Sequence, residues 1–219
     1  MTEIKKLRVL VCAVLVLFLD VAGGCAPTAP PVGAPQAGLK LPPVDSSFVM
    51  QNKNSGSFGS DTSQSTWKFL GEQTWQGRKL IAFSDGTLTN YGDPQRRLIA
   101  TVRGTTPVES YDPYYTGADW PLFVGKSWPN RFRYTDHRQN RTFENVQHDG
   151  KVEAYEEVRT LAGTFKAFKI NLGDQFLRVT QWYSPELALF IKTHTERLPG
   201  FFAGPGVRET ELVSYDFKP

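Results

Sequence analysis

The side chains with the widest chemical range in this sequence are three histidines, His137, His148 and His194. Imidazole can bind a metal or act as a base, but these histidines have no metal-ligand spacing such as HExxH, and both cysteines lie near the amino terminus. The sequence also contains no GxSxG elbow, Walker loop or dinucleotide fingerprint. It therefore predicts no catalytic site, no metal site and no cofactor.

Ser65 and Lys68 have the SxxK spacing of penicillin-recognising enzymes, in which the serine is a nucleophile. In those enzymes the serine opens a buried helix, whereas here the pair follows a flexible segment and enters an alternating β pattern. A serine nucleophile needs a base held within hydrogen-bond reach. We expect the match to be coincidental, which leaves a hydrolase as the remote alternative.

Large aromatic side chains are concentrated in two segments rich in Pro and Gly, Tyr111 to Phe123 and Gly200 to Gly206. We expect both segments to be loops, and aromatic loops on a rigid β scaffold often bind ligands or partners. The alternative is that Trp120, Phe123 and Trp128 cap the open end of the sheet as core residues. The candidate contact residues are Tyr111, Tyr114, Tyr115, Trp120, Phe123, Trp128, Phe201 and Phe202.

The elements that must position these side chains are strands. Short alternating runs of aromatic and β-branched residues stand between Gly, Asp, Asn and Pro turns, which predicts an all-β, mainly antiparallel domain. Asp85-Gly86, Asp149-Gly150 and Gly173-Asp174 indicate hairpin turns. One curled sheet, a half-barrel and a two-sheet sandwich all fit the pattern. The expected strands cover 65–74, 79–84, 87–91, 97–103, 131–136, 141–148, 151–160, 164–172, 175–183, 189–196 and 208–217.

The amino terminus has the pattern of a secretory signal, with a basic head and an apolar run of about eleven residues from Val9 to Leu19. That run is shorter than the roughly 20 residues of a membrane-spanning helix. The residues Val21 to Cys25 (VAGGC) resemble the lipobox of bacterial lipoproteins. The resemblance implies cleavage before Cys25 and acylation of its thiol. An ordinary secretory cleavage is the alternative, but it would leave Cys25 without a disulfide partner.

The predicted organisation is a signal peptide over 1–24, a tether over 25–65 and one β-rich domain over 66–219. The tether is Pro- and Ala-rich and then Ser- and Gly-rich, with flexibility expected over Asn52 to Ser65 and a short strand possible at Phe48 to Met50. The full chain has a formal net charge of +3, and loss of residues 1–24 removes three cations and two acids. No block of like charge remains, which argues against nucleic-acid binding.

Two later segments support a family comparison. Val152 to Ile170 and Gln181 to Thr193 contain an AGTF turn and a WYSP turn, and Leu122 to Trp128 carries LFVGKSW. Together they resemble uncharacterised bacterial envelope families such as the TapB-like proteins. The resemblance implies a β module in the cell envelope and no defined activity.

Three functions follow as hypotheses. The first is a non-enzymatic envelope lipoprotein, held in the lipid bilayer through acylated Cys25, whose domain binds or supports another envelope protein. The second is a carrier or chaperone for an apolar lipid or acyl ligand, and the third is a hydrolase. Ala26 follows the cysteine where an aspartate would favour inner-membrane retention, so the outer membrane, facing the periplasm, is the expected location.

Overall fold

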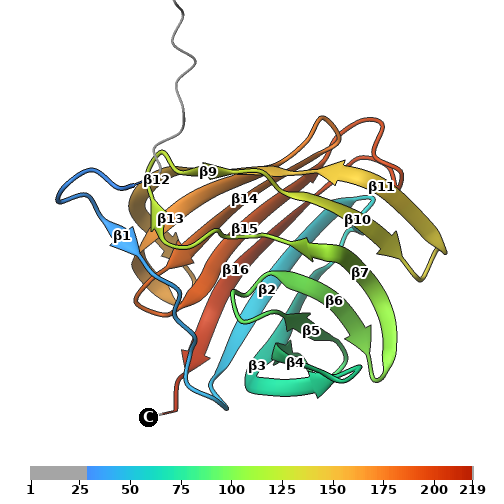
Figure 1. Cartoon of the computed structure of the whole chain (residues 1–219), viewed down its shortest axis with the longest axis horizontal. Coiled ribbons are helices and arrows are strands. Elements are labelled where there is room, and N and C mark those ends of the chain that lie inside the picture. Colours follow the sequence, from blue (N-terminus) through green and yellow to red (C-terminus); the bar gives the residue numbers. More distant parts are fainter. Residues whose placement is uncertain (1–28, 219) are drawn as a thin grey trace, which may run out of the picture.

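The computed structural model describes residues 29–218 and consists of strands and connecting segments (Figure 1). The signal peptide and Cys25 lie outside the described residues. The strands are β1 (Gln36–Ala37), β2 (Ser47–Gly56), β3 (Thr62–Trp75), β4 (Arg78–Ser84), β5 (Thr89–Gly92), β6 (Leu98–Arg103), β7 (Thr106–Tyr115), β8 (Leu122–Phe123), β9 (Ser127–Trp128), β10 (Arg131–Asp136), β11 (Arg141–Gln147), β12 (Asp149–Thr160), β13 (Gly163–Gly173), β14 (Leu177–Ser184), β15 (Leu189–Arg197) and β16 (Gly206–Asp216).

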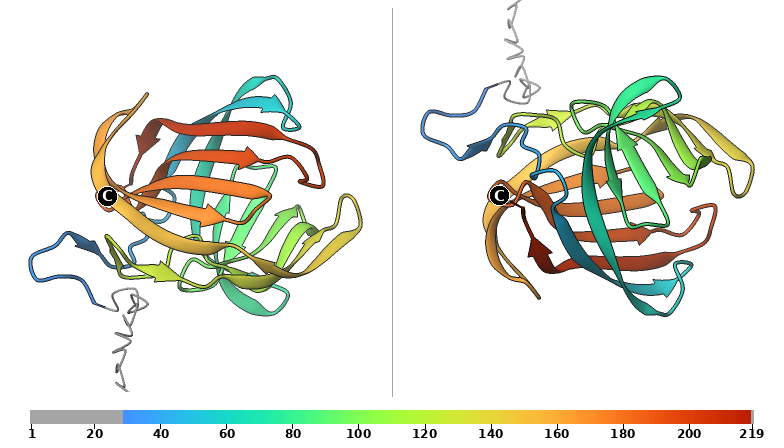
Figure 2. Two further views of the ribbon diagram at one scale, coloured as in Figure 1. Left: turned by 90° about the horizontal axis from the view of Figure 1, so that it is seen from above. Right: turned by 90° about the horizontal axis from the view of Figure 1, so that it is seen from below.

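Fourteen of these strands form a single antiparallel sheet in the order β11-β10-β7-β6-β5-β4-β3-β2-β16-β15-β14-β13-β12-β9, and β1 pairs separately with β8. The sheet curls so strongly that β13 to β16 face the strands β4 to β7 across an interior space (Figures 1 and 2). The all-β prediction is confirmed, and of its three forms the single curled sheet is the one observed.

The two edges of the sheet approach each other without pairing as a ladder. Residues 129 and 130 connect β9 at one edge to β10 beside the other, and His148 connects β11 to β12 in the same way. The His148 amide donates a hydrogen bond to the Asn130 carbonyl (3.0 Å), which bridges the two edges. The connections thus hold the two edges of the curled sheet together at this point.

The prediction of a hairpin at Asp149-Gly150 is wrong. These residues begin β12, which pairs with β9 and β13 and not with β11. Gly150 serves a different purpose, because a Cβ at this position would overlap the indole of Trp128. The glycine allows the tryptophan to pack directly on the backbone of β12.

The prediction of a flexible tether through residue 65 is also wrong. β2 and β3 cover most of the Asn52 to Ser65 stretch, and β2 is hydrogen-bonded on both sides, to β3 and β16. Its polar side chains have partners inside the curled sheet; for example, Asn52 Oδ1 accepts a hydrogen bond from Thr210 (2.7 Å). Even the Pro-rich part docks, since Ala37 is buried and β1 pairs with β8.

The segment from Tyr111 was expected to be a loop, but its first five residues belong to β7, between β6 and β10. The loop is the connection from residue 116 to 130, which contains β8 and β9. The Gly200 to Gly206 segment is a loop as predicted, with β16 beginning at its last residue.

One end of the interior is packed solid. Alternation along β13 directs Phe168, Ile170 and Leu172 inward, where they meet Tyr183 of β14. The 116–130 connection lies on this cluster, with the Trp120 ring 4.8 Å from that of Tyr183. A second apolar cluster forms where the tip of the β12–β13 hairpin reaches β16.

No helix within residues 29–218 is long and apolar enough to cross a membrane.

Candidate functional site

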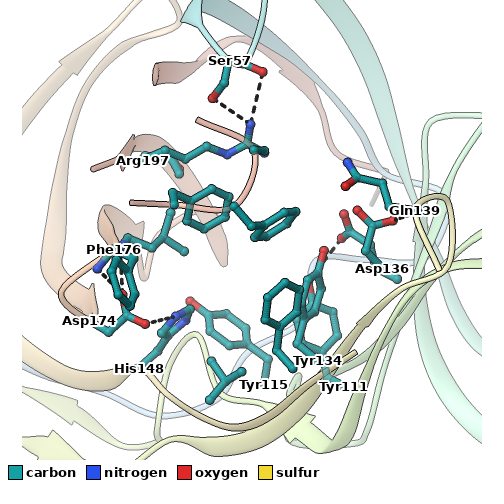
Figure 3. A pocket seen from close by; sticks show the side chains of 18 of the residues that line it. Ser57, Tyr111, Tyr115, Tyr134, Asp136, Gln139, His148, Asp174, Phe176 and Arg197 are labelled. Atoms are coloured by element: carbon teal, nitrogen blue, oxygen red, sulfur yellow. Dashed lines mark hydrogen bonds and ion pairs between the residues drawn. The ribbon is translucent and has the colours of Figure 1, made fainter. Parts of the chain in front are cut away.

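The other end of the interior is hollow and contains a cavity of about 790 Å³ that is partly open to solvent. Its walls come from β6, β7, β10, β11, β14, β15 and β16, and its rim from the turns after β2, β10, β13 and β15 (Figure 3). The aromatic lining residues are Phe58, Tyr111, Tyr115, Phe132, Tyr134, Phe143, Phe176, Phe201 and Phe202. The ionisable lining residues other than tyrosines are Glu109, Asp136, Arg138, His148, Asp174, Arg197 and Arg208.

One wall is built by cross-strand pairs between β7 and β10. Tyr111 lies opposite Tyr134 and Glu109 opposite Asp136, so alternation directs all four side chains inward. The two tyrosine rings are 5.3 Å apart, and the Tyr111 hydroxyl donates a hydrogen bond to Glu109 (3.2 Å). Burial and the nearby Glu109 carboxylate raise the pKa of both tyrosines, which stay neutral hydrogen-bonding groups at physiological pH.

The carboxylates of this wall are bound by Arg138, on the turn after β10. Its guanidinium contacts Glu109 (2.7 Å) and Asp136 (3.3 Å), and Asp136 also accepts hydrogen bonds from the backbone amides of Arg138 (2.9 Å) and Gln139 (3.3 Å). Burial alone would raise the pKa of Asp136, but the hydrogen bonds and charge of Arg138 lower it below its usual value. The acidic groups of this wall are therefore engaged within the protein.

The facing wall carries two arginines around one phenylalanine. Arg197, at the end of β15, places its Cζ 3.7 Å from the centre of the Phe58 ring, and Arg208 of β16 places its Cζ at 4.6 Å. Arg197 donates hydrogen bonds to the carbonyl and hydroxyl oxygens of Ser57 (3.2 Å each), as Figure 3 shows, and Arg208 donates one to Asn54 (2.8 Å).

His148 lies between these walls, at the seam, which is the place where the two edges of the sheet meet through the His148–Asn130 hydrogen bond. Its ring is edge-on to Tyr115 and Phe132, and its Nε2 is 3.4 Å from Asp174, on the turn after β13. Burial lowers the pKa of His148, and the Asp174 carboxylate partly offsets this effect. The neutral imidazole links β11 to the β13–β14 turn beside the cavity (Figure 3).

The predicted contact residues divide into two groups. Tyr111, Tyr115, Phe201 and Phe202 line the cavity. Trp120 and Trp128 belong to the packed end, and Phe123, which lies between them in sequence, is buried at 1% exposure, so these three pack as the alternative reading expected. Tyr114 contacts Arg97 and the separate cluster around Leu80.

The other candidate chemistry is not assembled. Three residues apart on β3, Ser65 and Lys68 point to opposite faces, and Lys68 forms an ion pair with Asp45 (2.7 Å). The Ser110 hydroxyl lies 2.9 Å from Nε2 of His137 at an exposed position, and no carboxylate of the described residues forms an ion pair with His137. Within 29–218 no group of three His, Cys, Asp or Glu residues could hold a metal.

Sequence patterns did not indicate Phe58, Arg138, Arg197 or Arg208. A usable signal existed for two of them, since Arg197 and Arg208 stand at the strand ends on either side of the predicted aromatic loop. Phe58 is a single aromatic residue in a polar stretch and Arg138 lies in a polar turn. Only the curl of the sheet brings them together.

No family model and no curated protein matches the chain, so the resemblance to TapB-like families stays a prediction. Two solved structures are similar at low TM-scores. A Parabacteroides distasonis protein provisionally described as a lipoprotein has a TM-score of 0.41 at 11% identity, and a Bacteroides fragilis protein provisionally described as exported, with a YmcC-like fold, has 0.39 at 8%. Each alignment covers 82% of this chain and 99% of the other. Neither likeness is close enough to inform function.

Proposed function

We propose that this protein is a lipoprotein of the bacterial cell envelope that holds a small amphipathic ligand inside its curled sheet. The observation that carries the binding proposal is the cavity of about 790 Å³ at the open end of the interior. Small-molecule sites commonly enclose about 300–1,000 Å³, with aromatic walls and a few placed polar groups. The described cavity has both features.

The membrane anchor in this proposal rests on the sequence. The VAGGC motif ends in Cys25, the one cysteine outside the signal peptide. Durable attachment by this route requires at least two acyl chains. The docking of β1 onto β8 leaves residues 25–35 as the connection between the lipid and the folded domain.

Carriage of a ligand is better supported than docking of a large protein partner. Half of the predicted aromatic contacts line a concave cavity, and the remainder are core residues or pack elsewhere. A flat exposed aromatic patch would have favoured docking. The proposed role is binding without catalysis, and a hydrolase stays the remote alternative.

The anchor is tested by Cys25→Ser. Metabolic labelling with a palmitate analogue should mark the wild-type protein and not the variant, and the variant should be recovered in the soluble fraction. Unchanged labelling of the variant would refute the lipoprotein assignment.

Ligand carriage is tested by filling the cavity. Thr195 lines it, so Thr195→Trp should displace the ligand, whereas Arg178→Trp on the outer face of the neighbouring strand should not. Molecules that co-purify with the lipoprotein from native membranes are compared by mass spectrometry. We expect one class to be depleted only in Thr195→Trp, and identical profiles in the three proteins would argue against carriage.

A further inference from the structure

Three arginines line the cavity, and two of them, Arg197 and Arg208, differ from the third in having no acidic partner in the described part of the chain. Arg138 is bound to Glu109 and Asp136, Arg131 to Asp149, and Arg133 to Glu144. Over residues 29–218, neither Arg197 nor Arg208 has a carboxylate within ion-pair distance. Each instead uses part of its guanidinium on neutral oxygens of the β2–β3 hairpin.

These guanidinium groups also lie close enough to affect each other. Burial, and then the positive charge of Arg208, lower the pKa of Arg197, and burial lowers the pKa of Arg208. Both remain protonated, because guanidinium does not lose its proton in proteins. Two like charges beside one ring are costly in a partly dehydrated site, and an anion that binds both of them would offset that cost.

The rest of the cavity offers an apolar body a place to bind. Six of its nine aromatic lining residues are phenylalanines, and Leu98, Val146 and Leu177 also line it. Phenylalanine has no hydroxyl or amide to pair with sugar hydroxyls, and the Glu109 and Asp136 carboxylates of the opposite wall are engaged by Arg138. The interior therefore suits a hydrocarbon chain better than a saccharide.

We propose that the ligand is an amphipathic anion, with a carboxylate or phosphate head bound by Arg197 and Arg208 and an acyl chain lying against the aromatic walls. This inference rests on the proposed function and adds the chemical class of the ligand. Guanidinium groups bind carboxylate and phosphate through paired, charge-assisted hydrogen bonds. The Phe58 ring contacts both groups by cation–π interaction and helps to hold them in place.

The position of the head follows from the charge distribution. Arg197 lies across the cavity from Asp174 and from the tyrosine wall (Figure 3). A head group bound by the arginines lies away from Asp174, and the nearer Glu109 carboxylate is already paired with Arg138, while the chain extends toward Tyr115 and Phe132. Phe201 and Phe202 of the β15–β16 loop also line the cavity.

The test measures binding of eight-carbon probes to the full lipoprotein in phosphatidylcholine nanodiscs by equilibrium dialysis, with empty nanodiscs as the blank. Octanoate and octyl phosphate carry the acidic head, octanol is neutral, octyltrimethylammonium is cationic, and glucuronate is an anion without a chain. We expect the acidic probes to bind on the order of 10-fold to 100-fold more tightly than octanol. The tighter of the two acidic probes identifies the natural head group.

Variants connect this preference to the two residues. Arg197→Gln and Arg208→Gln should each lower octanoate affinity on the order of 10-fold and leave octanol affinity unchanged, which also shows that the cavity is intact. Arg178→Gln is the matched control, since its exposed arginine on the outer face should affect neither probe.

Three results would overturn this inference while leaving ligand carriage in place: equal binding of octanoate and octanol, tighter binding of the cationic probe, or an acid preference that survives in both arginine variants. Glucuronate binding as tightly as octanoate would overturn the acyl part. Absence of binding by every probe above the blank would overturn the inference and the proposed function together.

Discussion

The two ends of the interior are enclosed by the same sheet, yet one is packed and the other is hollow. At the packed end, β13 and β14 contribute Phe168, Ile170 and Tyr183, each 0% exposed, and the 116–130 connection covers them. At the hollow end, inward positions of β15 and β16 carry Thr195, Arg197 and Arg208, and only short turns and one loop form the rim. The difference shows that strand alternation selects which residues face inward, whereas the connections determine whether the space is filled.

This contrast has a physical basis in the length of the connections. The segment between β7 and β10 is long enough to fold back over the sheet and insert Trp120 and Trp128. The turns at the other end are too short to reach the centre. Their charged and aromatic side chains therefore surround a space that remains open.

The largest expected effect is at the packed end. Phe168→Ala should lower the free energy of unfolding by about 3–5 kcal/mol, because it removes a ring buried against Tyr155 and Tyr183 and leaves a void. Chemical denaturation measures the change. A loss below about 1 kcal/mol would mean that this end is not tightly packed.

A smaller loss of stability is expected at the acidic wall of the cavity. Asp136→Asn should cost about 1–3 kcal/mol at neutral pH, because a buried carboxylate loses its charged hydrogen bonds. The pKa of Asp136 in the folded protein is below its ordinary 3.8, so this stabilisation is complete above that pH and is lost as the pH falls through the folded value. Denaturation curves from pH 7 to pH 3 should converge for the two proteins, and parallel curves would contradict the account.

Removal of a cavity aromatic should separate stability from binding. Phe202→Ala should change the free energy of unfolding by about 1 kcal/mol, since its partly exposed ring contacts mainly Phe143 and Phe201. It should nevertheless weaken binding of an acyl ligand, as measured by dialysis. A large stability loss without a change in binding would mean that Phe202 is a packing residue and not a binding residue, which contradicts the account of the hollow end.

The smallest effect concerns His148 at the seam. Burial lowers the pKa of His148 below the ordinary 6.5, so the folded protein favours the neutral ring. The contribution of this neutral ring to the free energy of unfolding is therefore complete above pH 6.5. Acidification below 6.5 should reduce stability, as the unfolded chain takes up a proton first. His148→Gln should remove this component from the pH dependence of the melting temperature, and an unchanged pH profile would contradict it.

Much of the sheet could be predicted from the sequence because inward and outward residues alternate clearly, as along Thr164 to Leu172. The second half of β2, beyond the short strand expected at Phe48 to Met50, was missed because its inward residues, such as Asn52, are polar at the hollow end. β7 was missed because Pro107 and Pro113 interrupt its pattern, although its pairing with β6 and β10 tolerates them.

The candidate site was only half predictable for a related reason. The aromatic residues were conspicuous in the sequence, but whether each one fills the core or lines the cavity depends on the path of the 116–130 connection. The grouping of Phe58 with Arg197 and Arg208 depends on contacts between residues about 140 to 150 positions apart. No local pattern encodes such a contact.

The central claim, a ligand inside the hollow end, is tested most directly by thiol protection. Cys25 is acylated in the proposed lipoprotein, so a cysteine introduced as Thr195→Cys in the cavity would be its single free thiol, and Arg178→Cys on the outer face is the control. The account predicts that octanoate slows maleimide alkylation of Thr195→Cys and leaves Arg178→Cys unaffected. Equal alkylation rates with and without octanoate at both positions would contradict it.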